Sequence, residues 1–353
     1  MGMESTKAET NFLSRIKKYP NKIHLALDSA DMEGFEYFNC DIYTSKPGTK
    51  SPSMKNKLIQ LGFKNGSKML KMASSYMPKM MKGINGSYDD AESLLDTLDK
   101  GLDIVDGNHP LLDTYPNTDV WHELKTYAWD KWKVIIGFTQ MPDELIFKGK
   151  GVLYNHALVC IQEMDKEAID HAPEMETADE VMRVYSTLGI AINDISNWLR
   201  NNHNINCHSN HPLGGLTNSV PLAVKAGMGY FGHNGLLITE EFGQRHRLAP
   251  IFIENKFFDY TDSDKHKWIG DFCKTCRKCE RSCPTGAIMS ENIDRHNIID
   301  GIGNIETSID REKCFPYFNK TMGCAVCIKV CPFSKADGTY DKLKEFIEKK
   351  TQS

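Results

Sequence analysis

The chain reads CKTCRKCERSCP at residues 273–284 and CAVCIKVCP at residues 324–332, with one further cysteine, Cys314, between these runs. The first run follows the pattern C-x2-C-x2-C-x3-C-P, and the second repeats its last part, C-x2-C-x3-C-P. The two runs are therefore copies of one pattern. Cys314 is the residue that can replace the cysteine missing from the second copy, so these eight cysteines decide how the C-terminal part of the chain folds.

The spacing of the first run is that of bacterial ferredoxins with two 4Fe–4S clusters, in which the fourth cysteine of a run ligates the other cluster. Structural zinc is the alternative, but it needs four ligands at one closed tetrahedral site and gives no reason for two runs that each end in Cys-Pro. We therefore expect two clusters and a protein that transfers electrons. The expected ligand sets are Cys273, Cys276, Cys279 and Cys331 for one cluster, and Cys283, Cys314, Cys324 and Cys327 for the other.

Length and composition leave room for much more than an electron carrier. The chain has 353 residues, of which 25% are charged and 40% hydrophobic, an ordinary globular balance. We expect an N-terminal region at residues 1–130, a core domain at 131–262 and a ferredoxin-like domain at 263–353. The net charge of −4 argues against a surface built throughout to bind nucleic acid.

Three cysteines remain outside the two runs and Cys314, namely Cys40, Cys160 and Cys207. We expect them to be reduced thiols in a low-oxygen cytoplasm rather than parts of a disulfide framework. The first residues, MGMESTK, have no apolar core and no twin-arginine pair, and no stretch of the chain is long and apolar enough to span a bilayer. The sequence therefore predicts a cytoplasmic protein with no membrane span.

The N-terminal region has an unusual charge pattern. Residues 42–88 contain nine lysines, six methionines and no acidic residue, and an acidic patch follows at residues 89–106. A basic segment of this kind would suit an acidic electron donor, a membrane surface or an RNA. The composition fits better with a solvated, partly helical segment that covers the core.

Apolar patterns predict the main elements of the core. Short apolar runs at 132–138, 151–161 and 248–253 predict buried strands, as do Ile238 and the early run 23–27. Residues 177–202 show helical periodicity, with Thr177 and Glu180 as a candidate capping box. Further helices are expected at 219–226 and 341–350. Four glycines between 227 and 235 indicate close approach of the backbone, but they follow a helix and so do not form a dinucleotide fingerprint.

The run SVPLAVKAGMGYFGHNGLLITEEFGQRHRL at residues 219–248, together with the two cysteine runs, resembles the corrinoid and iron–sulfur reductive dehalogenases. It is similar, more distantly, to the epoxyqueuosine reductases, which modify tRNA. The likeness covers roughly residues 152–334. It implies a mixed α/β (α+β) fold, with a nitroreductase-like or B12-processing-like core that binds base-off cobalamin and a C-terminal ferredoxin-like module. The corrinoid motif D-x-H-x-x-G is missed by one residue at Asp264, His266 and Gly270, which fits base-off binding.

The resemblance also implies catalytic residues. The family's proton donor is a tyrosine near the start of the long helix, where Tyr185 lies, and a cation assists it. Arg245 or Arg247, in a run that matches the family's G-P-R-V-R-L, would supply this cation and favour the phenolate left after proton transfer. Asn210 aligns with an active-site asparagine. The plainer alternatives are a tyrosine packed in the core and an asparagine bonded to its own loop.

The same resemblance implies a set of residues along the corrin, several of them small enough for close approach. His208, His211 and His233 are candidate ligands or acids, although histidines in loops more often make simple polar contacts. The expected corrin-binding residues are Gly214, Gly215, Thr217, Asn218, Gly229, Gly232, His233 and Asn234.

Three functions follow. The first is an oxidoreductase that cleaves a carbon–halogen or similar bond of a small substrate, with electrons from a ferredoxin or flavodoxin-type donor. The second is an epoxyqueuosine reductase acting on tRNA. In that branch the proton donor is an aspartate at the helix start, but no acid lies between Glu180 and Asp194, which favours the first. The third is a non-catalytic protein that transfers electrons or reduces a partner's corrinoid.

Overall fold

A computed structural model describes residues 118–146, 152, 154–212, 216–290, 298–299, 303–304, 309–321, 323–336 and 338–351. The lysine- and methionine-rich segment and the strand expected at 23–27 lie outside the described residues. None of the helices in this described part combines the length and apolar character needed to cross a membrane.

An antiparallel sheet forms the centre of the molecule. Its strands are β1 (Val134–Gln140), β2 (His156–Glu163), β6 (His246–Ile253) and β3 (Cys207–Ser209), in the order β1-β2-β6-β3. Cys160 of β2 pairs with Ile136 on one side and with Ala249 on the other. Most side chains on both faces of β2 are buried. A strand that is covered on both faces has an uninterrupted run of apolar residues in its sequence, and this is why the sequence predicted these strands.

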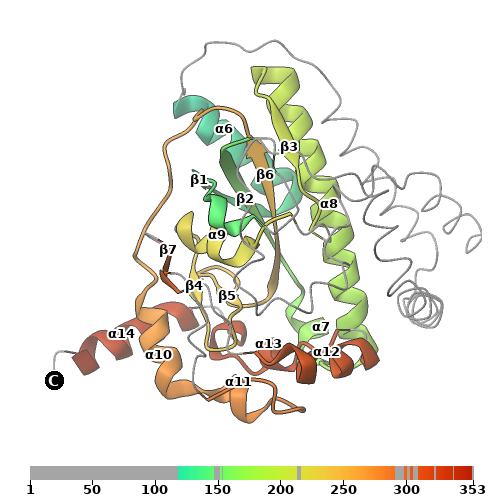
Figure 1. Ribbon diagram of the computed structural model, residues 1–353, viewed down its shortest axis with the longest axis vertical. Coiled ribbons are helices and arrows are strands. Elements are labelled where there is room, and N and C mark those ends of the chain that lie inside the picture. The colour runs from blue at the N-terminus through green and yellow to red at the C-terminus, as the bar shows by residue number, and fades with distance from the viewer. Residues whose placement is uncertain are drawn as a thin grey trace, which may run out of the picture.

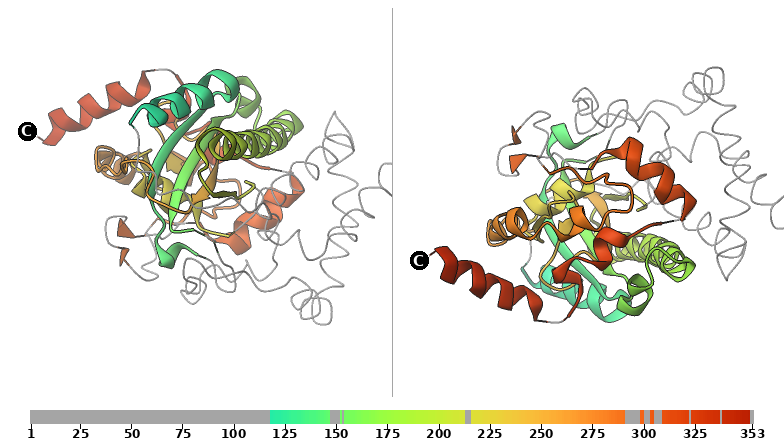
Figure 2. Two further views of the ribbon diagram at one scale, coloured as in Figure 1. Left: turned by 90° about the horizontal axis from the view of Figure 1, so that it is seen from above. Right: turned by 90° about the horizontal axis from the view of Figure 1, so that it is seen from below.

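Helices cover both faces of the sheet (Figures 1 and 2). On one face lie α6 (Thr118–Trp132) and α8 (Met175–His203), which pack on Phe138, Leu158 and Ile251. On the other face lie η4 (Asp143–Leu145), α9 (Ser219–Lys225) and the pair β4 (Tyr230–Phe231) and β5 (Leu237–Ile238). The expected boundary at residue 130 falls inside α6, which packs against β1 and therefore belongs to the core.

The long helix begins differently from the prediction. It starts at Met175, and its N-cap residue makes no side-chain capping bond, so the capping box expected from Thr177 and Glu180 was wrong. The short helix α7 (Lys166–Asp170) packs against this end of α8, and the Thr177 and Glu180 side chains hydrogen-bond its backbone instead. Thr177 Oγ1 donates to the Ala168 carbonyl at 2.7 Å, and Glu180 Oε1 accepts from the Asp165 amide at 2.6 Å.

The cysteine runs lie in the lower part of Figure 1, beneath the sheet. Their elements are α10 (Trp268–Cys276), α11 (Lys278–Arg281), α12 (Arg311–Lys320), α13 (Val326–Lys329), η5 (Pro332–Ser334) and α14 (Thr339–Thr351). A small pair of strands, β7 (Ile298–Ile299) and β8 (Gly303–Asn304), lies between the two runs in sequence. Phe272, Phe333 and Tyr340 pack with Ile238 of β5, so this module is joined to the core by a shared apolar cluster.

Candidate functional site

Four of the cysteines line one cavity. Cys273 and Cys276 lie on α10, Cys279 lies on α11, and Cys331 comes directly before η5. The cavity has an empty volume of about 290 Å³, part of which is open to solvent. These are the four cysteines that the sequence assigned to one cluster. We refer to this space as the first cysteine cavity.

The other four cysteines are also near neighbours. Cys327 lies close enough to interact electrostatically with Cys324, Cys279 and Cys314, and Cys324 with Cys283. We call Cys283, Cys314, Cys324 and Cys327 the second cysteine set. The structure therefore gathers the first predicted group around one cavity and places cysteines of the second group near one another and near Cys279. The assignment of ligands to the two clusters stays a prediction.

The backbone repeats along with the sequence. Arg277 follows Cys276 with a φ of 47°, and Ala325 follows Cys324 with a φ of 49°. These are equivalent positions of the two copies, and in both a short helix starts immediately afterwards, α11 in one and α13 in the other. Left-handed backbone is uncommon for residues other than glycine. Its recurrence shows that each copy folds its cysteines around the same turn.

The environment of the sulfur atoms fits thiolates bound to iron. Burial raises the pKa of Cys273 and of Cys327 to about 12, so as free thiols both would be protonated at neutral pH. A backbone N–H group points at one of the sulfurs, because the Ala287 amide donates to Cys283 Sγ at 3.3 Å. Such donors stabilise the negative charge of a cluster, and loading would release the thiol protons.

Tyr185, on α8, contacts a cation and packs against an apolar cluster. The Arg247 guanidinium carbon is 4.9 Å from the centre of the Tyr185 ring, within the range of a cation–π contact. The other side of the ring environment is apolar, since Tyr185 packs in the cluster that contains Leu236 and Cys327. Thr187 Oγ1 donates to Gln162 Oε1 at 2.7 Å, and Gln162 is the β2 partner of Arg247. A tyrosine and a cation thus meet at one end of the sheet, and a cysteine of the second set packs against the same apolar cluster as the tyrosine.

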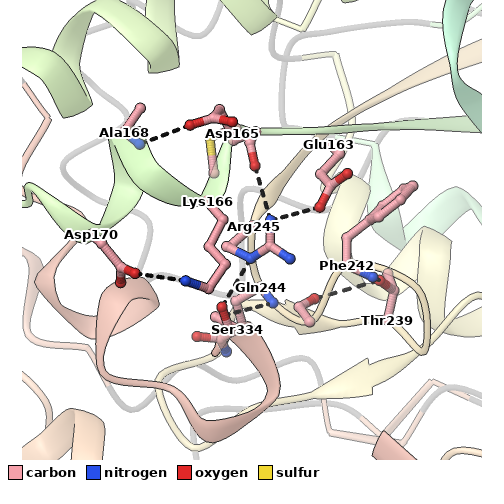
Figure 3. Close-up of polar contacts among 12 residues, drawn as sticks. Glu163, Asp165, Lys166, Ala168, Asp170, Thr239, Phe242, Gln244, Arg245 and Ser334 are labelled. Carbon is pink, nitrogen blue, oxygen red and sulfur yellow. Dashed lines mark hydrogen bonds and ion pairs between the residues drawn. The ribbon is translucent and has the colours of Figure 1, made fainter. Parts of the chain in front are cut away.

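The two candidate arginines have different surroundings. Arg245 Nη1 donates to Glu163 at 2.6 Å and to the Met164 carbonyl at 3.2 Å, and its Nε donates to the Ser334 carbonyl at 2.9 Å (Figure 3). Through these three hydrogen bonds the buried guanidinium, at the start of β6, joins β2 to η5. Of the pair, Arg247 is therefore the cation next to Tyr185.

The loop after β3 also reaches the long helix. The Asn210 amide donates to the Pro250 carbonyl at 3.0 Å, and its side chain donates to the His211 carbonyl at 3.1 Å. The His211 ring lies on Gly189, where an added Cβ would come within 2.2 Å of His211 Nε2. Gly189 is one helical turn beyond Tyr185 and hence on the same face. The signal for this contact was a glycine inside an otherwise regular helix, and the sequence analysis missed it.

The buried histidines are neutral. Burial lowers the pKa of His211 to about 3 and that of His208 to about 4. His208 lies 5.8 Å from the Phe252 ring, on the sheet face opposite α8. His266 is tied to α14, because its Nδ1 lies 2.6 Å from the Tyr340 hydroxyl. Of these three, only His211 is placed against the Tyr185 helix.

The residues expected along the corrin fall in separate places. Gly214 and Gly215 lie outside the described residues, Thr217 is bridged to Ile146, and the Asn218 amide donates to Leu145 at 2.9 Å. Gly229 packs on β5, where an added Cβ would lie 2.2 Å from the Ile238 carbonyl oxygen. The remaining three line the first cysteine cavity: Gly232, His233 and Asn234. Their contact with a corrin stays a prediction.

Gly189→Ala tests the contact between helix and loop. At an uncrowded helix position, replacing glycine by alanine would stabilise the protein by up to ~1 kcal/mol. Here the His211 imidazole must move to make room for the new methyl group, and such overpacking costs ~1–3 kcal/mol. We therefore expect a lower midpoint of thermal unfolding. Asn197→Ala, at an exposed position of the same helix, is the matched control and should change stability by less than ~0.5 kcal/mol.

His211→Ala in the Gly189→Ala background should recover part of the loss, because it removes the ring that clashes. A Gly189→Ala protein as stable as the parent, with no effect of the second change, would show that the His211 ring does not lie there.

Comparison with known proteins identifies the cysteine region and its relatives. Residues 272–334 match the family model of the 4Fe-4S double cluster binding domain. Over 200 residues the chain is 32% identical to a tetrachloroethene reductive dehalogenase of Desulfitobacterium hafniense, which covers 54% of this chain and 34% of that protein. Over 120 residues it is 34% identical to an epoxyqueuosine reductase of Cyclobacterium marinum, covering 32% of this chain and 36% of that protein. The chain thus spans about a third of the length of these relatives.

The fold is shared with a solved structure. The catabolic reductive dehalogenase NpRdhA, solved with 3-bromo-4-hydroxybenzoic acid, superposes with a TM-score of 0.56 at 19% identity over 72% of this chain and 39% of that chain. This likeness supports the mixed helix and strand architecture. The relationship itself rests on the sequence matches and on the double cluster domain.

Proposed function

Because this chain is related to the reductive dehalogenases and epoxyqueuosine reductases and carries a double 4Fe–4S cluster domain, we propose that it is a corrinoid-dependent reductase that removes a halogen from a small organic molecule. The proposal assigns cobalamin, held base-off, to the nitroreductase-like core at residues 131–262, and both clusters to the ferredoxin-like module at 263–353.

One observation carries the proposal. The Tyr185 ring lies with the Arg247 guanidinium 4.9 Å from its centre and shares an apolar cluster with Cys327. Reductive removal of a halide requires three groups at one place. They are a proton source, a cation that stabilises the anion left after proton transfer, and an electron source. The reaction balances as R–X + 2 e⁻ + H⁺ → R–H + X⁻.

The chain's own residues have separate tasks in this reaction. A bound corrinoid supplies the strongly reducing metal centre that carries electrons to the carbon–halogen bond. Tyr185 donates the proton from its hydroxyl, and Arg247 stabilises the phenolate that remains. The apolar cluster against which Tyr185 packs lowers the polarity on that side of the ring, which strengthens the attraction between cation and phenolate.

The two cysteine groups define an order of electron transfer. Tyr185 packs against the same apolar cluster as Cys327 of the second cysteine set, whereas Arg277 and Lys278 are among the residues that line the first cysteine cavity. Electrons therefore enter at the first cluster and leave from the second. These basic side chains, of which Arg277 is paired with Glu280, suit an acidic donor of the ferredoxin or flavodoxin type, and reduction by such a donor should slow as ionic strength rises.

The tRNA-directed alternative is less well supported. Among the epoxyqueuosine reductases the expected donor is an acid at the helix start. Here the acid is Glu180, one turn before Val184 and Tyr185. Its carboxylate already accepts a hydrogen bond from the Asp165 amide and pairs with Arg183 at 2.6 Å. Tyr185 is consequently the better proton donor in this chain.

Halide release tests the proposal. Anaerobic protein loaded with iron, sulfide and cobalamin is given a chemical reductant and a panel of chlorinated ethenes and halogenated phenols. We expect one halide for every two electrons consumed, and none when cobalamin is left out. Turnover of epoxyqueuosine in a tRNA stem loop, with no halide release from any member of the panel, would favour the alternative.

A further inference from the structure

Arg247 carries a positive charge that no ion pair within the described residues balances. Its Nη1 donates to the neighbouring His246 carbonyl at 3.2 Å, whereas its Nε is buried and has no hydrogen-bond partner. The guanidinium carbon lies 4.9 Å from the centre of the Tyr185 ring, but a cation–π contact uses the charge and none of the N–H groups. A buried N–H without an acceptor is costly and rare in folded proteins, so Nε points to an acceptor brought by a bound molecule.

Two glutamates lie on elements close to Arg247, and both are paired with other arginines. Glu163, on β2, accepts from Arg245 at 2.6 Å. Gln162 is the residue opposite Arg247 on β2, so Glu163 points to the other face of the sheet. Glu180, on α8, pairs with Arg183 at 2.6 Å. Neither carboxylate therefore serves as the counter-ion of Arg247.

The shape of the guanidinium decides which kind of molecule fits. Its N–H groups lie in one plane, and those of Nε and Nη2 form a fork along one edge. A carboxylate accepts two parallel hydrogen bonds from such a fork, whereas a neutral chlorinated ethene accepts none. Gln162 does not compete for this edge, because its Oε1 accepts from Thr187 Oγ1 at 2.7 Å.

We propose that Arg247 binds the carboxylate of an anionic substrate, so that the molecule reduced here is a halogenated carboxylic acid rather than a neutral chlorinated ethene. The inference rests on the proposed function for the reaction and adds the substrate class. One guanidinium then has two tasks: its charge acts on Tyr185, and its N–H edge holds the substrate beside that tyrosine.

Binding without turnover tests the carboxylate site. Anaerobic protein loaded with iron, sulfide and cobalamin, with no reductant, is titrated in a calorimeter with matched acids and amides. The pairs are meta-bromobenzoate with meta-bromobenzamide, and chloroacetate with chloroacetamide. Each amide has nearly the size of its acid and lacks the charge. We expect at least one acid to bind ~10–100-fold more tightly than its amide, the range for charge-assisted hydrogen bonds.

Substitution of Arg247 should remove this preference selectively. In Arg247→Met the dissociation constant of the acid should rise ~10–100-fold, to that of the amide, while the constant of the amide stays the same. A merely structural role would weaken the binding of acid and amide alike. Arg247→Lys keeps the charge without the fork and should keep part of the preference. Arg183→Met is the control, because that guanidinium is exposed and paired with Glu180, and it should change neither constant.

No preference for the acid in either pair, or a preference that survives in Arg247→Met, would overturn the proposal. Iron and cobalt are measured in every variant, and Arg247→Gln replaces Arg247→Met if that protein loses either metal. Halide release separates this result from the proposed function. Release from chlorinated ethenes alone would contradict an anionic substrate and leave the dehalogenase reaction standing. Tight binding of an acid that depends on Arg247, with no halide release from any compound, would support the carboxylate site and contradict the reaction.

Discussion

Tyr185→Phe is expected to lower the rate of halide release by ~10²–10⁴-fold, the range for removal of a positioned proton donor. The phenylalanine keeps the ring that packs against the apolar cluster containing Val181 and Val184 and that lies next to Arg247, so only the hydroxyl is lost. Iron and cobalt content should equal those of the parent protein. Steady-state rates and metal analysis on the same preparation check both expectations.

Tyr260→Phe is the control for this experiment. The Tyr260 hydroxyl lies 2.9 Å from His156, which pairs with Gln140 at the end of β2 remote from Gln162. Its removal should cost ~1 kcal/mol of stability and leave the rate unchanged. Equal activity of Tyr185→Phe and the parent would show that another group donates the proton.

Arg247→Lys and Arg247→Met separate charge from shape. The lysine retains a cation at the Tyr185 ring and should keep more activity than the methionine, which retains only an aliphatic chain. Equal rates in the two variants would contradict the assigned role of the cation.

Substitution of the cysteines should show pairing across the runs. Cys283→Ser and Cys324→Ser change residues of different runs but of one predicted cluster, so both should alter the same EPR signal. Cys279→Ser and Cys331→Ser should alter the other signal. Each variant is expected to stop halide release, since transfer through both clusters is required.

If Cys279→Ser and Cys283→Ser both altered the same EPR signal and left the other signal intact, each run would hold its own cluster. The EPR spectra of dithionite-reduced protein distinguish these outcomes before any assay of activity.

The sequence predicted the parts of the molecule that depend on regular spacing. The first cysteine group lines one cavity as expected, and the matching turns at Arg277 and Ala325 show that each copy of the pattern carries its own geometry. The strands β1, β2 and β6 lie within a few residues of the predicted runs, since their side chains are buried on both faces.

Tertiary contacts decided the rest. Thr177 and Glu180 have the spacing of a capping box, but α7 packs against the helix start and takes both side chains. Arg245 and Arg247 lie in one short run, and only the packing shows that Glu163 and Ser334 hold the first while Tyr185 meets the second. Gly232, His233 and Asn234 line the first cysteine cavity, which the sequence did not indicate, and their contact with a corrin stays a prediction.

The most direct test of the central claim is the metal content of anaerobic protein prepared with cobalamin, measured with an EPR spectrum of the resting state. The account predicts about eight iron atoms per chain, in two 4Fe–4S clusters, and about one cobalt with the signal of a base-off corrinoid. The same iron with no cobalt, despite an excess of cobalamin, would contradict it. The chain would then be an electron-transfer protein whose core domain binds something else.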